Sequence, residues 1–317
     1  MKLIEHKIYI VPLQFDSSKL ITRATGLKYA SDMTWDCDTI DHLDRHTDKL
    51  NIIDCRITEA ECEFLENYIS QHKTTPFMLT IADPYESKCK DHWYYKMLFR
   101  VKNMPNVTFL TKYLPAEIVK TLQDSIPEDK MVFIPYPFVD SYSSSSNFKH
   151  RRKKVIFSGS IGSIYPYRCR FRRRVKLNPL LWSKVTFLEH PGYADIGENL
   201  KHQVIGEAYI DLLSNYRFMF VSPSRCGLEF MKYRECAYAR CVPIGKAPDS
   251  FSEAMSSAFL HLDFDRIYQS LQKCFSIPVD ELEARSKSYY EAFAAERNPE
   301  ILNKKLDAFL ESRGFIE

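Results

Sequence analysis

Short runs of β-branched, aromatic and other apolar residues recur along the whole chain, each bounded by Pro, Gly, Asp or Ser. Several runs show no alternation of polar and apolar positions, which is typical of strands buried on both faces of a parallel sheet. The runs are KIYIVPL, NIIDCRI, FMLTIAD, NVTFLTKY and MVFIPYPF in the first half, and VIFSGSI, KVTFLEH, YRFMFVS, CVPIG and FLHLDF in the second. Helix-like segments separate them at 58–70, 114–124, 206–216 and 280–296. This alternation predicts an α/β fold with two doubly wound, Rossmann-like domains, each built on a parallel sheet.

The joint between the two domains is marked by a change of composition. The chain has 317 residues, more than the roughly 100–200 expected for one domain. IPYPFVDSYSSSSNFKHRRKK, at 134–154, runs from a proline-rich strand end through a serine tract into a basic cluster, and such tracts are flexible and exposed. The predicted organisation is an N-terminal domain over 1–140, a linker over 141–152, a C-terminal domain over 153–296, and a final helix over 297–317 that packs back on the first domain.

The composition excludes several classes of protein. The net charge of +3 is too small to indicate a nucleic-acid-binding protein by itself, although positive charge is concentrated in FKHRRKK (148–154) and RCRFRRR (168–174). The nine cysteines form no C-x-x-C pair, which favours buried thiols in a reducing compartment over disulfides or a zinc site. No run approaches the ~20 apolar residues of a membrane span, and no signal peptide is recognisable. We therefore expect a cytoplasmic protein that reaches a membrane only peripherally.

Three strand ends in the second half carry residues suited to anion binding. In open α/β sheets, ligands bind at the carboxyl ends of strands, where helix N-termini direct free amides toward anions. In VIFSGSIGSIYPYRCRF, at 155–171, Ser158 and Gly159 follow a strand and Arg168 opens a helix. Small residues let backbone amides approach a phosphate, and Arg168 can neutralise it. A plain strand–turn–helix connection with an exposed basic helix explains the same pattern.

The second strand end, KVTFLEHPGY at 184–193, carries His190. A histidine at this place can contact a sugar or a phosphate, or act as an acid. A turn histidine without a special role is the alternative.

The third strand end is VSPSRCGLEFMKYRECAYARCVPIG, at 221–245. If the helix begins near Glu229, its first amides are exposed and Lys232 adds a cation for a diphosphate. Glu229 and Glu235 are six residues apart and cannot share one face of a regular helix, so we expect Glu229 in the loop and Glu235 in the first turns. Each carboxylate can accept two hydrogen bonds from a vicinal diol, of a ribose or of a sugar. The alternative is an exposed Glu–Lys–Glu helix face.

These motifs resemble the donor-binding part of group-1-type glycosyltransferases, which have the two-domain GT-B fold with a cleft between the domains. The likeness covers most of 131–250 and is to the branch related to spore-maturation glycosyltransferases, with similarity to the Lys-x-x-Glu stretch of exostosin-like enzymes. FSGSIGSIYPYR looks like the family's Gly-Ser turn and Tyr-Pro-x-Arg, and IPYPFVD stands where such enzymes end their first domain. The resemblance implies that the donor is bound by Ser158, Gly159, Arg168, His190, Ser222, Glu229, Lys232, Tyr233 and Glu235.

The resemblance further implies an enzyme of carbohydrate biosynthesis, a hexosyl- or related transferase. It would move a sugar from a nucleoside-diphosphate sugar to a hydroxyl of a glycan or polysaccharide acceptor. Arg168, Lys232 and the helix amides would stabilise the leaving diphosphate, so neither a metal nor another cofactor is expected. Glu235 would hold the ribose, and Glu229 would hold the sugar as a candidate catalytic residue.

The stereochemistry of the transfer is left open by the sequence. Transfer with inversion needs a base from the first domain, for which Asp16, Asp83 and Glu86 are candidates because each follows a predicted strand. Transfer with retention needs no such base.

Three other functions are compatible with the same residues. The basic clusters fit a DNA-modifying glycosyltransferase that acts on a hydroxylated base, with nucleic acid as the partner. His190-Pro191 with Ser222 and Ser224 fits a sialyl- or Kdo-type transferase that uses a CMP-linked sugar. A binding module that kept the fold and lost turnover is the third, because a fold alone does not determine activity.

Overall fold

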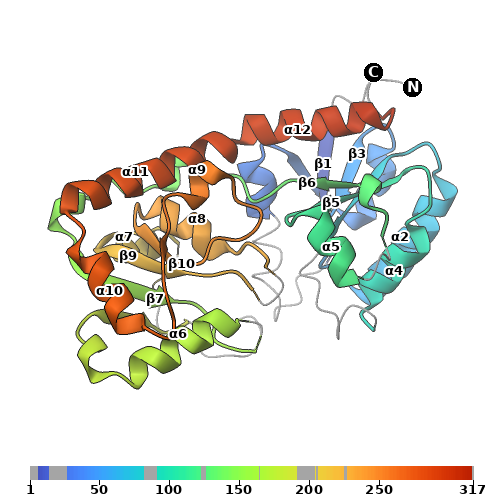
Figure 1. The fold of residues 1–317 in the computed structure, drawn as a ribbon. Helices are drawn as coiled ribbons and strands as arrows, with labels where there is room; N and C mark the ends of the chain where they lie inside the picture. Colours follow the sequence, from blue (N-terminus) through green and yellow to red (C-terminus); the bar gives the residue numbers. More distant parts are fainter. Residues whose placement is uncertain are drawn as a thin grey trace. The chain divides into compact units, whose positions relative to one another are not determined.

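The computed structural model describes residues 6–13, 27–81, 91–122, 126–163, 165–190, 204, 206–224 and 227–315. These residues form two compact units, the first holding the described residues up to Pro137 and from Pro299 onward, the second those from Phe138 to Asn298. Each unit contains one sheet with helices on its faces (Figure 1). Within the described residues, no helix is long and apolar enough to cross a membrane.

The first unit is built on a six-stranded parallel sheet with the strand order β2-β1-β3-β4-β5-β6. Ile8, Tyr9 and Ile10 of β1 are all buried, although consecutive side chains point to opposite faces, so both faces of the sheet are covered. The strands are β1 (Lys7–Val11), β2 (Asp36–Thr39), β3 (Leu50–Ile53), β4 (Phe77–Ile81), β5 (Val107–Thr111) and β6 (Met131–Phe133). The prediction of a parallel sheet in the first half is confirmed.

The helices of the first unit begin and end at recognisable sequence signals. The helices are α2 (Glu59–Gln71), α4 (Trp93–Val101), α5 (Pro115–Leu122) and α12 (Pro299–Ser312), with 3-10 helices η2 (Ile40–His46) and η3 (Glu128–Lys130). Thr58 and Glu61 form a capping box at the start of α2, in which each side chain accepts a hydrogen bond from the other's backbone amide. Leu302, Leu306 and Leu310 of α12 repeat every four residues and are buried in a core shared with β1 and β5.

The second unit is built on a five-stranded parallel sheet with the order β11-β10-β9-β7-β8. Its strands are β7 (Arg152–Ser158), β8 (Val185–Leu188), β9 (Tyr216–Val221), β10 (Val242–Gly245) and β11 (Leu260–His261). Its helices are α6 (Pro166–Lys176), α7 (Gly206–Ser214), α8 (Met231–Tyr238), α9 (Glu253–Ser256), α10 (Ile267–Ser276) and α11 (Val279–Glu296), with η4 (Asp140–Tyr142), η5 (Phe148–His150) and η6 (Pro179–Leu181).

Two separate apolar clusters cover the two faces of this second sheet. Ile156 and Met219 belong to a cluster with side chains of α7, α8, α9 and α11. Their neighbours Phe157 and Phe220 point the other way, into a cluster with side chains of α6 and α10. The sheet is therefore doubly wound, as the unbroken apolar runs predict.

Residues 141–152, expected as a flexible linker, belong to the second unit and include buried side chains. The Arg151 guanidinium donates hydrogen bonds to the carbonyl oxygens of Ala239 (2.7 Å) and Arg240 (2.6 Å), which follow the end of α8. A cation is favoured there because the carbonyls at a helix C-terminus lack intrahelical donors. Phe148 enters the sheet core, and the Ser144 amide donates to the Tyr238 carbonyl at 2.8 Å. The serine tract is thus held by polar contacts that its composition does not indicate.

Candidate functional site

The switch point of the second sheet lies between β7 and β9. From β7 the chain continues outward to β8 and then returns to β9 on the other side of β7. Loops at the carboxyl ends of such strands diverge and leave a crevice, which is where open α/β sheets bind ligands. Ser158, at the end of β7, and Gly159, directly after it, stand at this point.

At Gly159 the backbone lies close to two cationic side chains. Its φ of +102° lies in the region that favours glycine. A Cβ added to Gly159 would lie 3.0 Å from Arg168 Nη1 and 3.0 Å from Lys232 Cε. No side chain larger than hydrogen fits between the loop and these two residues without displacing one of them.

Arg168 packs against this loop and donates a hydrogen bond to it. Its side chain is buried, its Nη1 donates to the Ser160 carbonyl at 3.4 Å, and its guanidinium carbon lies 4.6 Å from the centre of the Tyr165 ring. Burial lowers the pKa of Arg168, but an arginine keeps its charge throughout the physiological range. Arg168 therefore contributes positive charge beneath Gly159 and fixes the turn that follows it.

Lys232 is the centre of a hydrogen-bonded cluster. Its Nζ donates to Glu235 Oε2 at 2.6 Å and to the Tyr209 hydroxyl at 2.9 Å. The Tyr209 hydroxyl also donates to Glu235 Oε2 at 3.3 Å and shares a hydrogen bond with Ser158 Oγ. Side chains from β7, α7 and α8 thus meet at one place, although they lie as much as 77 residues apart in the chain (158 to 235).

The protonation of the cluster follows from its surroundings. Burial by itself lowers the pKa of Lys232, but the Glu235 carboxylate and the Tyr209 hydroxyl outweigh burial and raise that pKa above its ordinary value. Burial and the Glu235 carboxylate raise the pKa of Tyr209 to about 12. At neutral pH, Lys232 is therefore a cation and Tyr209 is a neutral hydroxyl.

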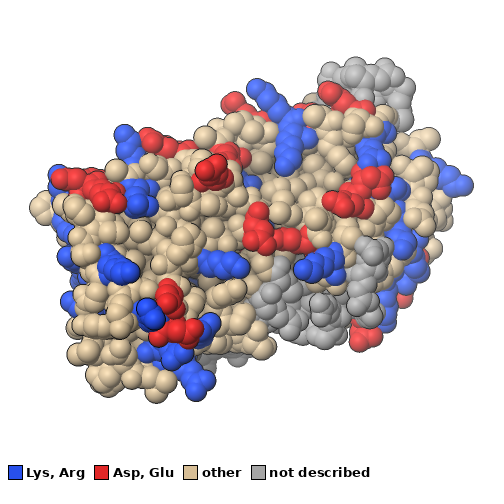
Figure 2. Space-filling view, viewed as in Figure 1, with Lys and Arg blue, Asp and Glu red and all other residues tan. Residues whose placement is uncertain are grey.

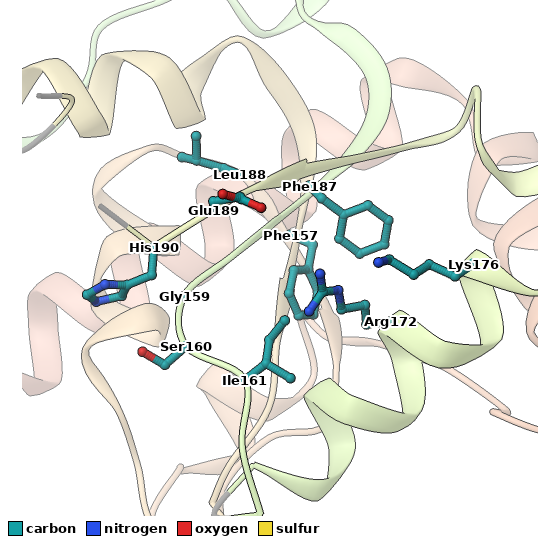
Figure 3. A pocket seen from close by; sticks show the side chains of 10 residues that line it. All are labelled: Phe157, Gly159, Ser160, Ile161, Arg172, Lys176, Phe187, Leu188, Glu189 and His190. Atoms are coloured by element: carbon teal, nitrogen blue, oxygen red, sulfur yellow. The ribbon is translucent and has the colours of Figure 1, made fainter. Parts of the chain in front are cut away.

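Two adjoining cavities open at this edge of the sheet. The smaller, of about 200 Å³, is lined by Ser158, Gly159, Leu188, Glu189, His190, Val204, Gly206, Tyr209, Lys232 and Glu235. The larger, of about 420 Å³, is lined by Phe157, Gly159, Ser160, Ile161, Arg172, Lys176, Phe187, Leu188, Glu189 and His190 (Figure 3). Gly159, Leu188, Glu189 and His190 line both, so the two cavities adjoin along these residues.

The larger cavity combines aromatic rings with cations. Figure 3 shows Arg172 and Lys176 extending from α6 toward the rings of Phe157 and Phe187. The two ring centres lie 5.3 Å apart. This cavity therefore offers flat apolar surface beside two cationic side chains.

Five of the predicted site residues come together at these cavities: Ser158, Gly159, His190, Lys232 and Glu235. Arg168 lies directly behind them at Gly159 and lines neither cavity.

Glu229 lies elsewhere, in a buried ion pair. Its Oε2 accepts hydrogen bonds from Arg297 Nη2 at 3.0 Å and from Ser250 Oγ at 3.1 Å, and it lines neither cavity. Burial raises the pKa of Glu229, although Arg297 opposes the increase. α8 begins at Met231, so Glu229 precedes the helix and Glu235 stands in its second turn. The placement of Glu229 indicates a structural contact with the residue that follows α11.

Tyr233 and Ser222 also lie outside the two cavities. Tyr233 is fully buried among aromatic side chains, and its hydroxyl donates to the Lys246 carbonyl at 2.7 Å. Ser222 directly follows β9 and is fully buried, and its Oγ makes no hydrogen bond with any described residue. The candidate bases Asp16, Asp83 and Glu86 fall outside the described residues.

Sequence reasoning missed Tyr209, Arg172 and Lys176. Arg168, Arg172 and Lys176 are spaced four residues apart, which places them along one side of α6 and could have extended the site from Arg168. Tyr209 had no comparable signal, because its role depends on where α7 packs beside α8. Within the described parts of the chain, no group of three or more His, Cys, Asp or Glu side chains is arranged to hold a metal ion.

Comparisons with known proteins show the fold of the chain. No protein-family model and no curated protein matches its sequence. Among solved structures, the α,α-trehalose-phosphate synthase (UDP-forming) of Burkholderia vietnamiensis matches with a TM-score of 0.58 and 12% identity, over 92% of this chain and 75% of that one. A lipopolysaccharide outer core galactosyltransferase matches with a TM-score of 0.54 and 7% identity, over 97% and 99%. A glycosyltransferase of Rickettsia africae matches with a TM-score of 0.50 and 12% identity, over 96% and 98%. The two parallel-sheet α/β units therefore constitute the GT-B fold.

Proposed function

We propose that this protein is a glycosyltransferase that moves a sugar from a nucleoside-diphosphate sugar to an acceptor hydroxyl. The observation that carries the proposal is the convergence of Lys232 and Arg168 on Gly159, at the switch point of a GT-B-type sheet. A backbone turn that only glycine fits, with cations beside it, is suited to a diphosphate. On the motifs at 155–171 and 221–245, we place the chain with the group-1-like enzymes, near the spore-maturation and exostosin-like branches.

The diphosphate would bind beside Gly159 and Lys232. Departure of a nucleoside diphosphate leaves negative charge on the phosphate oxygens, and preorganised donors stabilise that charge most in the transition state. Lys232 keeps its proton because its pKa is raised, and Arg168 adds a second charge beneath the loop. These two cations supply the stabilisation, so the proposal assigns no role to a metal.

The nucleoside would bind along the larger cavity. Glu235 accepts hydrogen bonds, as a ribose diol requires, and already faces the smaller cavity next to Lys232. A base can stack on the Phe187 ring and receive a hydrogen bond from Arg172 or Lys176. At about 420 Å³ the cavity is within the range of small-ligand sites.

A glycan or polysaccharide hydroxyl is the proposed acceptor. Asp16 or Asp83 would act as the base if the transfer inverts configuration.

Release of nucleotide from sugar donors tests this function. Purified protein is incubated with UDP-, GDP- and CMP-linked sugars, with and without glycan acceptors, and free nucleotide is measured. A nucleoside diphosphate should be released by the wild type and not by Lys232→Met, while Lys287→Met, an exposed lysine of α11, should behave as the wild type. Release of CMP alone would replace the proposal with a CMP-sugar transferase, and no release or binding of any nucleotide would refute it.

A further inference from the structure

An exposed apolar turn lies at the end of α6. Leu177, Leu180 and Trp182 are 71%, 63% and 62% exposed, and they fall within six consecutive residues. The other large apolar residues that are exposed in the described part of the chain, Leu13, Phe64, Ile161 and Ile301, stand singly. Single exposed apolar residues are ordinary, whereas a cluster marks an interaction surface.

The turn, residues 177–182, is held in place by the fold. Leu181 points inward and is fully buried in the sheet core. Trp182 Nε1 donates to the Lys176 carbonyl at 3.2 Å, and Asn178 Oδ1 accepts from the Leu180 amide at 3.1 Å. Three apolar side chains are thus exposed to water on an ordered segment. Their hydration is unfavourable, and contact with an apolar partner would remove that cost.

Positive charge surrounds this turn. Residues 141–188 contain twelve Lys and Arg and no Asp or Glu. Val155 and Val185 are paired in parallel strands, so the amino ends of β7 and β8 lie side by side. Three lysines, Lys153, Lys154 and Lys184, lie at these amino ends, as does the turn. Figure 2 shows blue side chains, with red ones among them, beside uncharged surface at the lower left, where α6 lies in Figure 1.

Acidic neighbours neutralise only part of this charge. Asp265 pairs with Arg170 at 2.7 Å and with Arg174 at 2.9 Å, and Asp280 pairs with Lys149 at 2.8 Å. In the described parts of the chain, Lys153, Arg173, Lys176 and Lys184 form no ion pair with an acidic side chain.

We propose that the 177–182 turn docks onto an anionic lipid membrane surface. Leucine and tryptophan side chains enter the boundary between head groups and acyl chains, where tryptophan is favoured, and nearby Lys and Arg bind anionic head groups. A nucleic acid would use the cations but would leave the exposed leucines unexplained, since phosphates and sugars offer them no apolar partner. A lipid surface accounts for both features.

The proposed surface lies at the amino ends of the strands, whereas Glu189 and His190 of the candidate site lie at the carboxyl end of β8. Lys176, which directly precedes the turn, also lines the larger cavity. The turn leads into the first residue of β8, whereas Glu189 and His190 follow its last. A strand of four residues spans about 13 Å. The surface therefore holds the protein at the membrane with the carboxyl ends of the strands directed away from the bilayer, and of the residues named for it only Lys176 also lines the candidate site.

Vesicle binding tests the proposal. The full chain is mixed with phosphatidylcholine vesicles that contain or lack phosphatidylglycerol, and the bound fraction and tryptophan emission are recorded. Binding should require phosphatidylglycerol, and emission should shift to shorter wavelength, because Trp182 is exposed whereas Trp35 is buried and Trp93 half-buried. Trp182→Phe should retain binding and lose the shift.

The variants separate a lipid surface from the other partners. Leu177→Ser/Leu180→Ser/Trp182→Ser should abolish vesicle binding, and Lys153→Gln and Lys184→Gln should each weaken it about fivefold. Phe64→Ser and Lys304→Gln, exposed residues of the first unit, are the matched controls and should bind as the wild type. Circular dichroism confirms that each variant is folded. Equal binding by the folded triple variant, binding to duplex DNA without binding to vesicles, or self-association through the turn without vesicle binding would each overturn the proposal.

Discussion

The Nζ of Lys232 lies 2.6 Å from Oε2 of Glu235, one turn farther along α8. The pair is partly buried, and both side chains face the smaller cavity. A lysine held by one carboxylate and one hydroxyl still has donor capacity, because an ammonium carries three protons. Lys232 is thus fixed in position and can still bind an anion.

Gly159→Ala should lower stability and weaken nucleotide binding. At the positive φ of Gly159 any side chain is strained, and a methyl group would also force Arg168 and Lys232 to shift, so we expect a loss of ~1–3 kcal/mol. Urea unfolding measures the loss. Gly162→Ala is the matched control, because nothing lies within 4 Å of its Cβ position. Equal stability of the two variants would show that Gly159 is not constrained.

Glu229→Ala should destabilise the protein without a specific effect on the site. Removing one partner leaves Arg297 buried without its counter-charge, which costs ~3–5 kcal/mol. The more conservative Glu229→Gln should remain folded and bind a nucleotide sugar as tightly as the wild type, measured by calorimetry. A large loss of affinity in Glu229→Gln with unchanged stability would show that Glu229 contacts the bound sugar.

Arg151→Ala should destabilise the second unit. Arg151 donates to the carbonyls of Ala239 and Arg240 from a buried position, and charged hydrogen bonds contribute ~1.5–3 kcal/mol each. Thermal unfolding of Arg151→Ala beside Lys153→Ala, its exposed neighbour on β7, measures the difference. A flexible linker at 141–152 would predict no difference between the two.

Much of the fold could be predicted from the sequence because its signals are local. Unbroken apolar runs predicted the buried parallel strands, and the Thr58 and Glu61 pattern predicted the start of α2 within one residue. The helix predicted at 280–296 is observed at 279–296. These features depend on residues a few positions apart, so a single sequence contains them.

The site could be predicted only in part, because some of its contacts are not local in the sequence. Gly159, Lys232 and Glu235 follow strand ends, and parallel topology brings such ends together. Tyr209 and the partner of Glu229 depend on packing between distant helices, since Arg297 lies 68 residues from Glu229. The sequence places Glu229 in a loop before a helix, where a carboxylate can bind a diol, and no local pattern distinguishes a buried structural carboxylate from one that faces a ligand.

The stability contributed by Lys232 should be lost in alkali. Its folded-state pKa is raised above the ordinary 10.5, so its contribution is complete below about pH 10 and decreases as the pH rises through the folded pKa. The difference in free energy of unfolding between the wild type and Lys232→Met should therefore be constant between about pH 7 and 9 and shrink above about pH 10. Urea titrations across this range measure it, and a difference that grows with pH would contradict the assigned pairing.

Calorimetric titration with UDP and GDP measures diphosphate binding at the site without an acceptor or turnover. The wild type should bind at least one of the two nucleotides. Lys232→Met should bind at least ~10-fold more weakly, as expected for the loss of a charge-assisted contact to phosphate, while Lys287→Met should bind as the wild type. Equal affinity in the wild type and Lys232→Met would show that the diphosphate does not bind beside Lys232.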